Sequence, residues 1–388
     1  MGAIRTLAIG GGIGGLSLAR EFIIRGLPVT VLERAPQLNP VGAGIIMNPN
    51  AMRVLEENGL ADAVRQGGWP YMIRETYDRR GNLLAIRDYR PLYSGGKISI
   101  GALVHRAHLL HVLYEGLRSG VVRFGVRVRK IDLLPDEVRV ETDQGEIFVA
   151  DLLVGADGIH SQVRDHVFGV TEPLYMGYRS HRFVVENNLG MENFTEFLGR
   201  GKRIGLVPIS KNQLYVWTTF NSPIESRELA MTSADRFREF FGEFKNERVG
   251  TAFSQLESTD GMICTDVEEI RRGGWVKERV ALLGDAAHAV TPNIGQGAGM
   301  AMEDAAVLAQ EVDAARDAPR QLPEALGRYV IRRRPRVENV MRLSRQVGAE
   351  GQMSNPIACW LRNHRIRRAG RDAPRMLEEL ERLLAYRI

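Results

Sequence analysis

A glycine-rich turn between a short strand and a helix lies near the start of this chain. The apolar run at residues 3–9 predicts a first strand, and Gly10, Gly12 and Gly15 follow with the spacing G-x-G-x-x-G. Helical apolar spacing continues over residues 16–24. The first glycine permits a tight turn, the second lets a pyrophosphate approach the backbone, and the third lets helix and strand pack closely. This pattern predicts an α/β sheet that binds a dinucleotide.

Acidic residues follow two of the predicted strands. The strand at residues 29–32 ends in Glu33, at the distance where a carboxylate binds a ribose hydroxyl pair. A second apolar run, residues 152–156, leads to Asp157 and Gly158, and Ser161 could cap the short helix that follows. By itself Asp157 is more typical of a turn or a cap than of a ligand.

A third strand-to-helix turn lies near the C-terminal third of the chain. The strand predicted at residues 280–283 ends in Gly284 and Asp285, and a bend with Pro292 follows. The stretch Gly295-Gln296-Gly297 then opens a helix predicted over residues 298–309. Such a helix start offers free backbone N–H groups and a positive dipole end to an electron-rich group. Together, the three turns indicate one shared cofactor.

In this order and spacing, the three motifs resemble those of the single-component FAD-dependent aromatic hydroxylases, the group A flavoprotein monooxygenases. The resemblance extends along nearly the whole chain and is nearest to bacterial hydroxylases of nitrogen heteroaromatics, namely alkylquinolone 3-hydroxylases and urate hydroxylases. It implies an α/β fold with a Rossmann-type FAD-binding domain of the glutathione-reductase kind, an inserted and mostly antiparallel β-sheet substrate domain, and C-terminal helices.

The chain alternates between two kinds of pattern, which predict a discontinuous domain. We expect the FAD-binding domain at residues 1–70, 95–170 and 270–345, the substrate-binding sheet domain at 71–94 and 171–269, and a C-terminal helical segment at 346–388. Hairpins are predicted at 73–87 and 127–142, alternating strands between 178 and 220, and helices at 233–244, 322–345 and 374–385.

The family resemblance implies a role for each motif. The first glycine loop would hold the FAD pyrophosphate, Arg106 would lie near the ribityl or phosphate region, and Val128 would offer its backbone to the adenine. Pro292 would close over the isoalloxazine ring. The complete set of expected FAD-binding residues is Gly10, Gly12, Ile13, Gly14, Gly15, Glu33, Arg34, Gly44, Arg106, Val128, Asp157, Asp285, Pro292, Gly295, Gln296 and Gly297.

Two residues are expected to be catalytic. Arg203 and Tyr215 match substrate-pocket positions of the urate hydroxylases, and a cation beside the ring could stabilise a deprotonated heteroaromatic. An arginine in a surface turn and a tyrosine in an ordinary strand remain the alternative. Ser180 and Asn293 depart from that pattern, which has asparagine and aspartate there, and this puts urate itself in doubt. Residues 201–205 and 360–363 look nearer the quinolone hydroxylases, so a quinolone-like substrate is favoured.

The implied reaction consumes NADH or NADPH and O2 and hydroxylates an aromatic or N-heteroaromatic ring through a flavin C4a-hydroperoxide. The alternatives are urate hydroxylation, halogenation or double-bond reduction on the same fold, or a non-catalytic escort-type binding protein. Isolated tryptophans argue against a halogenase with its W-x-W-x-I-P motif. Glu33 and the intact glycines at 295–297 argue against an escort protein.

Composition indicates a cytoplasmic enzyme, and we expect a monomer or a homodimer. No run approaches the roughly 18–20 apolar residues of a membrane helix, and the first strand begins too early for a signal peptide. The two cysteines are far apart and the histidines do not converge, so we expect no disulfide and no metal site. The net charge is +5, with arginines concentrated at 332–336 and 362–371. These runs are a solvated face, or they attract NAD(P)H or a membrane surface; nucleic-acid binding lacks interleaved aromatic residues.

Overall fold

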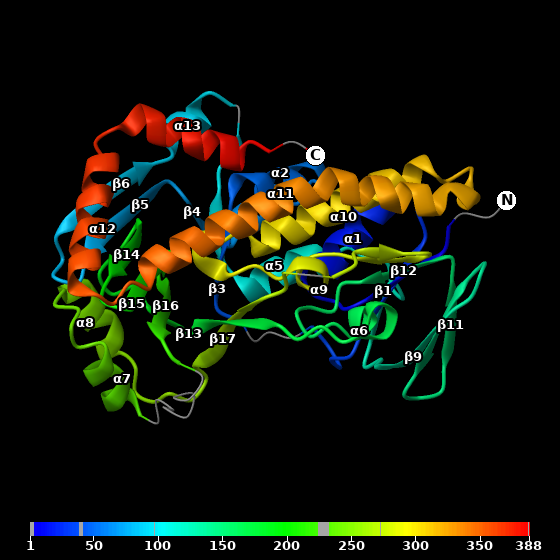
Figure 1. Cartoon of the computed structure of the whole chain (residues 1–388), viewed down its shortest axis with the longest axis horizontal. Helices are drawn as coiled ribbons and strands as arrows, with labels where there is room; N and C mark the ends of the chain where they lie inside the picture. Colours follow the sequence, from blue (N-terminus) through cyan, green and yellow to red (C-terminus); the bar gives the residue numbers. More distant parts are fainter. Residues whose placement is uncertain (1–3, 39–41, 97, 224–232, 272, 387) are drawn as a thin grey trace.

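The computed structural model describes residues 4–38, 42–96, 98–223, 233–271, 273–386 and 388. Two large sheets organise these residues (Figure 1). The six-stranded sheet has the order β18-β19-β12-β1-β2-β8, and all its pairs are parallel except β18 with β19. Its strands are β1 (Thr6–Ile9), β2 (Val29–Glu33), β8 (Val122–Phe124), β12 (Leu152–Gly155), β18 (Val276–Lys277) and β19 (Val280–Leu282).

The seven-stranded sheet has the order β17-β13-β16-β15-β14-β5-β6 and is antiparallel except where β14 pairs with β5. It consists of β5 (Ile73–Asp78), β6 (Leu83–Asp88), β13 (Leu174–Glu186), β14 (Phe194–Leu198), β15 (Lys202–Pro208), β16 (Gln213–Asn221) and β17 (Ile263–Glu269). Because β5 and β6 come from residues 71–94 and the other strands from residues 171–269, we propose that these two segments form one substrate domain, as the sequence pattern predicts.

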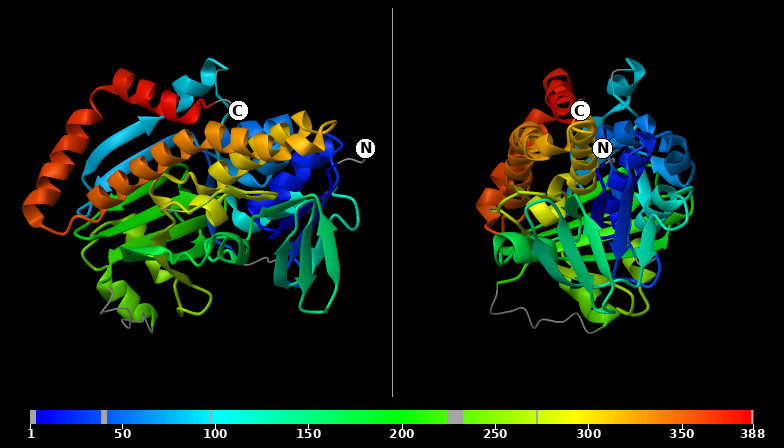
Figure 2. Two further views of the ribbon diagram at one scale, coloured as in Figure 1. Left: turned by 45° about the vertical axis from the view of Figure 1, so that its right-hand side comes forward. Right: turned by 90° about the vertical axis from the view of Figure 1, so that its right-hand side faces the viewer.

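Two smaller sheets complete the strands in the described ranges. One contains β9 (Val128–Leu133), β10 (Val138–Thr142) and β11 (Ile147–Ala150), and the other contains β3 (Gly44–Met47), β4 (Gly68–Pro70) and β7 (Ala102–His105). The sheet of β9–β11 lies at one end of the long axis of the molecule (Figures 1 and 2). Both predicted hairpins are confirmed, since β5 pairs with β6 and β9 with β10 in antiparallel register.

Helices cover both large sheets. The main ones are α1 (Ile13–Ile24), α2 (Pro49–Glu57), α5 (Arg106–Tyr114), α6 (Gln162–Phe168), α7 (Ala234–Phe240), α8 (Glu247–Ser254), α10 (Gly297–Ala314), α11 (Leu322–Gly351), α12 (Pro356–Ala369) and α13 (Ala373–Leu384). Shorter pieces are α3 (Ala61–Gln66), α4 (Arg90–Ser94), α9 (Asp285–His288), η2 (Pro292–Ile294) and η3 (Pro319–Gln321). None of the helices in the described ranges has the length and apolar character needed to cross a membrane.

Close packing of α1 explains its glycines. A Cβ on Gly15 would lie 1.9 Å from the carbonyl oxygen of Gly10, and a Cβ on Gly14 would lie 2.6 Å from the side chain of Leu283. The expected role of the third glycine in helix–strand packing is therefore confirmed. Strands β1 and β12 are buried throughout, as parallel strands covered on both faces require.

Three helix predictions differ from the structure. The helix predicted over 233–244 ends at Phe240, and Phe241 and Phe244 reach the apolar core from the turns around Gly242. The helix predicted over 322–345 continues to Gly351. Helix α12 lies within the predicted helical segment 346–388, but its bounds were not predicted. Asn355 followed by Pro356 is the residue pair of a helix start, and the Asn355 side chain accepts from two backbone N–H groups.

Candidate active site

A cavity of about 1020 Å³ lies between the two large sheets. One side is formed by the turns after the parallel strands, including Gly12 and Asp285, and the other by the seven-stranded sheet, including Arg203 and Tyr215. In a parallel sheet the carboxyl ends of the strands meet at one edge, so these turns converge although the chain separates them widely. The volume is at the upper end of the roughly 300–1,000 Å³ typical of small-molecule sites.

Two helix starts face this cavity. Helix α1 begins after Gly12 and α10 begins at Gly297, and both glycines line the cavity. A Cβ added to Gly12 would meet no atom within 4 Å, so its backbone faces open space. Free N–H groups and the positive ends of two helix dipoles thus point into the same cavity. This arrangement fits a pyrophosphate or the anionic edge of a ring. Ile13, Gly14, Gly44, Pro292 and Gly295 also line it.

Asp285 and Arg106 are the charged residues on the cofactor side. The Asp285 carboxylate is open to the cavity. The protein around it removes part of its hydration and so raises its pKa, and His288 and Arg106 partly oppose this rise. Burial and the nearby Arg182 lower the pKa of Arg106. Arg106 starts α5, and the preceding His105 ring accepts a hydrogen bond of 3.2 Å from the Ala107 N–H. Both side chains can therefore contact the polar middle of a bound dinucleotide.

A buried charge cluster braces the Asp285 turn. The Asp304 carboxylate accepts from the Gly284 N–H at 2.9 Å, from Arg333 Nε at 2.7 Å, and lies 2.5 Å from His288 Nε2. Burial alone would raise the pKa of Asp304, but His288 and Arg333 outweigh it and lower the pKa to about 2. His288 thus supports the turn.

Seven of the expected cofactor residues do not line the cavity, namely Gly10, Gly15, Glu33, Arg34, Val128, Asp157 and Gln296. Glu33 remains at the carboxyl end of β2, where its carboxylate accepts from the backbone N–H groups of Gly11 at 2.6 Å and Ala35 at 2.8 Å. Arg34 is exposed beside it, and Val128 is buried at the start of β9.

Asp157 and Gln296 have protein partners in the structure. The Asp157 carboxylate accepts from the Ser161 hydroxyl at 2.5 Å and from the Val163 N–H at 3.1 Å, and Ser161 caps α6 as expected. Gln296 is buried and exchanges two side-chain hydrogen bonds with Asn50, at 2.9 and 3.2 Å. Both side chains shape the turns that line the cavity, where Ala156, Gly158 and Gly297 present their backbone.

Arg203 occupies the centre of the substrate side. It is buried, lines the cavity, and donates to the Asn293 amide oxygen and, at 3.2 Å, to the Thr219 hydroxyl. Glu196 lies 3.5 Å away and also pairs with Arg74 at 2.5 Å. Burial lowers the pKa of Arg203, and Glu196 opposes this. Two cations thus share one carboxylate beside the cavity.

Tyr215 lies on the neighbouring strand, with its ring against the backbone of Gly44 at the cavity wall. A Cβ on Gly44 would lie 2.4 Å from that ring, so only glycine permits this contact. Burial raises the pKa of Tyr215 to about 12, partly opposed by Arg182. The hydroxyl is therefore protonated at neutral pH and can donate a hydrogen bond.

Several lining residues were missed in the sequence. Arg179, Arg182 and residues 263–268 line the cavity, and Arg182 donates to the Thr265 hydroxyl. Period-two alternation could have found Arg182, because it shares a strand face with Ser180, which also lines the cavity. No group of three or more His, Cys, Asp or Glu side chains in the described part of the chain could hold a metal ion.

Comparison with known proteins identifies the family. Residues 3–344 match the model of the FAD binding domain family. The chain is 35% identical over 379 residues to 2-heptyl-3-hydroxy-4(1H)-quinolone synthase of Pseudomonas aeruginosa, covering 96% of each chain. It is 34% identical over 377 residues to aurachin C monooxygenase/isomerase of Stigmatella aurantiaca, covering 95% of each.

A solved structure shows the same fold. The crystal structure of Klebsiella pneumoniae HpxO complexed with FAD and uric acid matches with a TM-score of 0.87 at 28% identity, covering 98% of this chain and 96% of that one. The converging glycine turns, the two helix starts and these similarities all indicate FAD as the cofactor. The chain therefore belongs to the FAD-binding monooxygenase family and is an FAD-dependent monooxygenase.

Proposed function

We propose that this enzyme consumes NADH or NADPH and O2 and hydroxylates an aromatic or N-heteroaromatic ring, with a 4-quinolone as the favoured substrate. The observation that carries this proposal is the buried Arg203 beside the cavity, paired through Glu196 with Arg74. The relatives support it, since one is named for a 3-hydroxy-4-quinolone and another structure contains uric acid, which are both nitrogen heteroaromatics.

The cofactor side fits FAD. The backbone of Gly12 and the first turn of α1 would hold the pyrophosphate, Glu33 the adenosine ribose, and the residues from Gly295 to Gly297 the edge of the flavin ring. Bound FAD, once reduced, supplies the activation of O2 and the electrophilic oxygen that a ring carbon accepts. The remaining functions belong to the side chains around it.

Arg203 would stabilise negative charge on the substrate. Asn293 carries no charge, so the Arg74–Glu196–Arg203 group retains a surplus positive charge in a buried environment. A hydroxyheteroaromatic ring that has lost a proton is more electron-rich and reacts more readily with an electrophilic oxygen. A fixed cation at low dielectric favours that form. The protonated Tyr215 hydroxyl adds a donor on the neighbouring strand.

The substrate sheet would also shield the reaction from water. Trp217, Ile46 and Ile263 line the cavity beside the polar groups, and the far face of the sheet packs on the phenylalanine-rich core of α7 and α8. With water excluded on substrate binding, the effect of Arg203 would be stronger and reactive oxygen species would be protected from loss to water. We place the reaction in the cytoplasm, since Cys264 and Cys359 are free thiols.

The test is a substrate screen on the FAD-loaded enzyme. Quinolones, phenols and purines are each added with NADH or NADPH, and coenzyme oxidation is measured together with hydroxylated product by mass spectrometry. Stoichiometric product from a 4-quinolone supports the proposal. Comparable turnover of urate would favour the urate hydroxylase alternative. Coenzyme oxidation without hydroxylated product from any ring would contradict it.

A further inference from the structure

The outward face of α12 is apolar where the helix begins. Ile357, Trp360 and Leu361 are 70%, 64% and 50% exposed. With the spacing i, i+3 and i+4, they lie together on one side of the helix. Scattered exposed apolar residues are common, but a contiguous group with a tryptophan marks an interaction surface.

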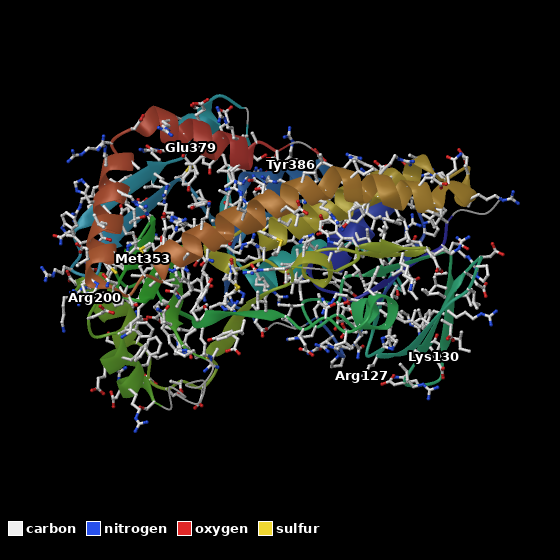
Figure 3. The ribbon with its side chains drawn as sticks, viewed as in Figure 1. Arg127, Lys130, Arg200, Met353, Glu379 and Tyr386 are labelled. Atoms are coloured by element: carbon white, nitrogen blue, oxygen red, sulfur yellow. The ribbon has the colours of Figure 1, made fainter. Side chains whose placement is uncertain are left out.

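The same face becomes basic toward the end of α12. His364, Arg365 and Arg368 continue the stripe, and His364 stacks on Trp360 with ring centres 5.9 Å apart. Arg371 and Arg200 are also exposed, and Arg200 lies near the start of α12 at one end of the molecule (Figure 3). We call the stripe formed by Ile357, Trp360, Leu361, His364, Arg365 and Arg368 the α12 outer face.

The opposite side of α12 holds the helix in place. The buried Arg362 donates to the carbonyl oxygens of Glu350 at 3.2 Å and Gly199 at 3.1 Å, and Cys359 is buried between them. The Asn355 cap fixes the first turn. Helix α12 is thus anchored through its inner side, and the fold does not require a tryptophan on its outer face.

We propose that the α12 outer face docks on an anionic phospholipid membrane surface. A helix with tryptophan and aliphatic residues beside arginines lies in the interfacial plane of a bilayer, where the indole sits at headgroup level and the guanidinium groups meet phosphates. The stripe contains no acidic residue, so its basic half complements anionic lipid and its apolar half can enter the interface. This inference depends on α12 and is independent of the proposed substrate.

A second copy of the chain fits this surface less well. In a two-fold contact the same stripe meets itself. A parallel arrangement would oppose Arg365 and Arg368 to their own copies, and an antiparallel one would bury them against Ile357 and Trp360. Arg365 pairs with Glu350 at 2.7 Å, but the stripe offers no acidic partner to Arg368. Burying a guanidinium group without such a partner is costly. Lipid phosphates neutralise them in either orientation.

Vesicle binding of the FAD-loaded protein tests this inference. Sedimentation is compared for vesicles of phosphatidylcholine alone and with roughly 30% phosphatidylserine, at moderate salt. Brominated lipid chains should quench Trp360 fluorescence on the anionic vesicles. The apolar variant is Ile357→Ser/Trp360→Ser/Leu361→Ser and the basic variant is Arg365→Gln/Arg368→Gln/Arg371→Gln. The matched control is Arg127→Gln/Arg129→Gln/Lys130→Gln, which also removes three positive charges, at the opposite end of the molecule from α12, where Figure 3 labels Arg127 and Lys130.

We expect wild type and control to bind anionic vesicles, and the basic variant to bind on the order of 100-fold more weakly, since each arginine contributes about fivefold. The apolar variant should lose the quenching while it keeps its FAD absorbance, which shows that it is folded. Equal binding to neutral and anionic vesicles, or no binding by wild type, overturns the proposal. So does a wild-type dimer without vesicle binding that the apolar variant dissociates, because the face is then an interface between copies.

Discussion

Arg203 donates a hydrogen bond to the side-chain oxygen of Asn293, and this contact joins the substrate sheet to the loop before α10. The Asn293 amide nitrogen in turn lies 2.9 Å from the Thr291 and Tyr178 hydroxyls and 3.0 Å from the Ser344 carbonyl oxygen. The loop that carries Pro292 is therefore positioned by both the sheet and α11. The expected substrate cation and the expected flavin-covering residue are parts of one network.

Replacing Arg203 tests its role in the reaction. We expect Arg203→Gln to lower kcat/KM for hydroxylation on the order of 100-fold, as for removal of one preorganised charge donor. The FAD content should stay unchanged, because Asn293 keeps its hydrogen bonds to Tyr178, Thr291 and Ser344 and the loop before α10 stays in place. Product formation and flavin absorbance are measured together. The exposed neighbour Arg200→Gln serves as the control. Unaltered kinetics in Arg203→Gln would remove this residue from the site.

Replacing Gly12 separates folding from FAD binding. Its backbone angles of −79° and −168° suit any residue, and a Cβ there meets no protein atom within 4 Å, so Gly12→Val should fold. The valine would fill the space that a pyrophosphate needs, and FAD should be lost. Flavin absorbance and circular dichroism report the two effects. Gly250→Val is the control, since Gly250 also has open space around it and lies in α8. A Gly12→Val protein with stoichiometric FAD would contradict the assignment.

Asp304 should stabilise the protein far more than a comparable surface carboxylate. Asp304→Asn removes a fully buried charge between His288 and Arg333, and we expect a loss of about 3 kcal/mol in the free energy of unfolding. Glu146→Gln removes an exposed pair to Arg123, with side chains that are 41% and 43% exposed, and should cost less than about 1 kcal/mol. Urea unfolding of both variants at saturating FAD makes the comparison. Equal losses in the free energy of unfolding would show that the buried cluster stabilises the protein no more than a surface pair does.

His181 should make the protein less stable in mild acid. Its ring is stacked on Phe220 behind the cavity wall, and burial, helped by Arg179, lowers its pKa from 6.5 to about 4. As the pH falls from 6.5, the unfolded chain takes up a proton while the native ring stays neutral until about pH 4. The free energy of unfolding should therefore drop by up to about 3 kcal/mol across this window and not further from this group. His181→Gln should flatten this part of the curve; parallel curves for both proteins would refute the account.

Much of the cofactor side could be predicted from the sequence because its signals are local. Gly10, Gly12 and Gly15 lie within one strand-turn-helix unit. Gly10 has a positive φ of 106°, Gly12 has open space beside its backbone, and Gly15 packs on the carbonyl oxygen of Gly10. The same holds for the turn from Gly284 to Gly297. Local patterns could not show that the Gln296 side chain would form hydrogen bonds with Asn50, since that partner is 246 residues away.

The chain's sequence by itself determined the two kinds of sheet, the glycine turns and the family, because short-range backbone demands and periodicity encode them. Only the tertiary structure decided that Arg203 is buried against Glu196 and Asn293. It also decided that two glycines of α11 leave room for these side chains: a Cβ on Gly348 would lie 2.5 Å from Asn293, and a Cβ on Gly351 would lie 2.5 Å from Arg203. It also decided that Trp360 faces outward. Alternation along a strand or helix tells which residues share a face, but the partners of that face come from distant segments whose packing no local pattern records.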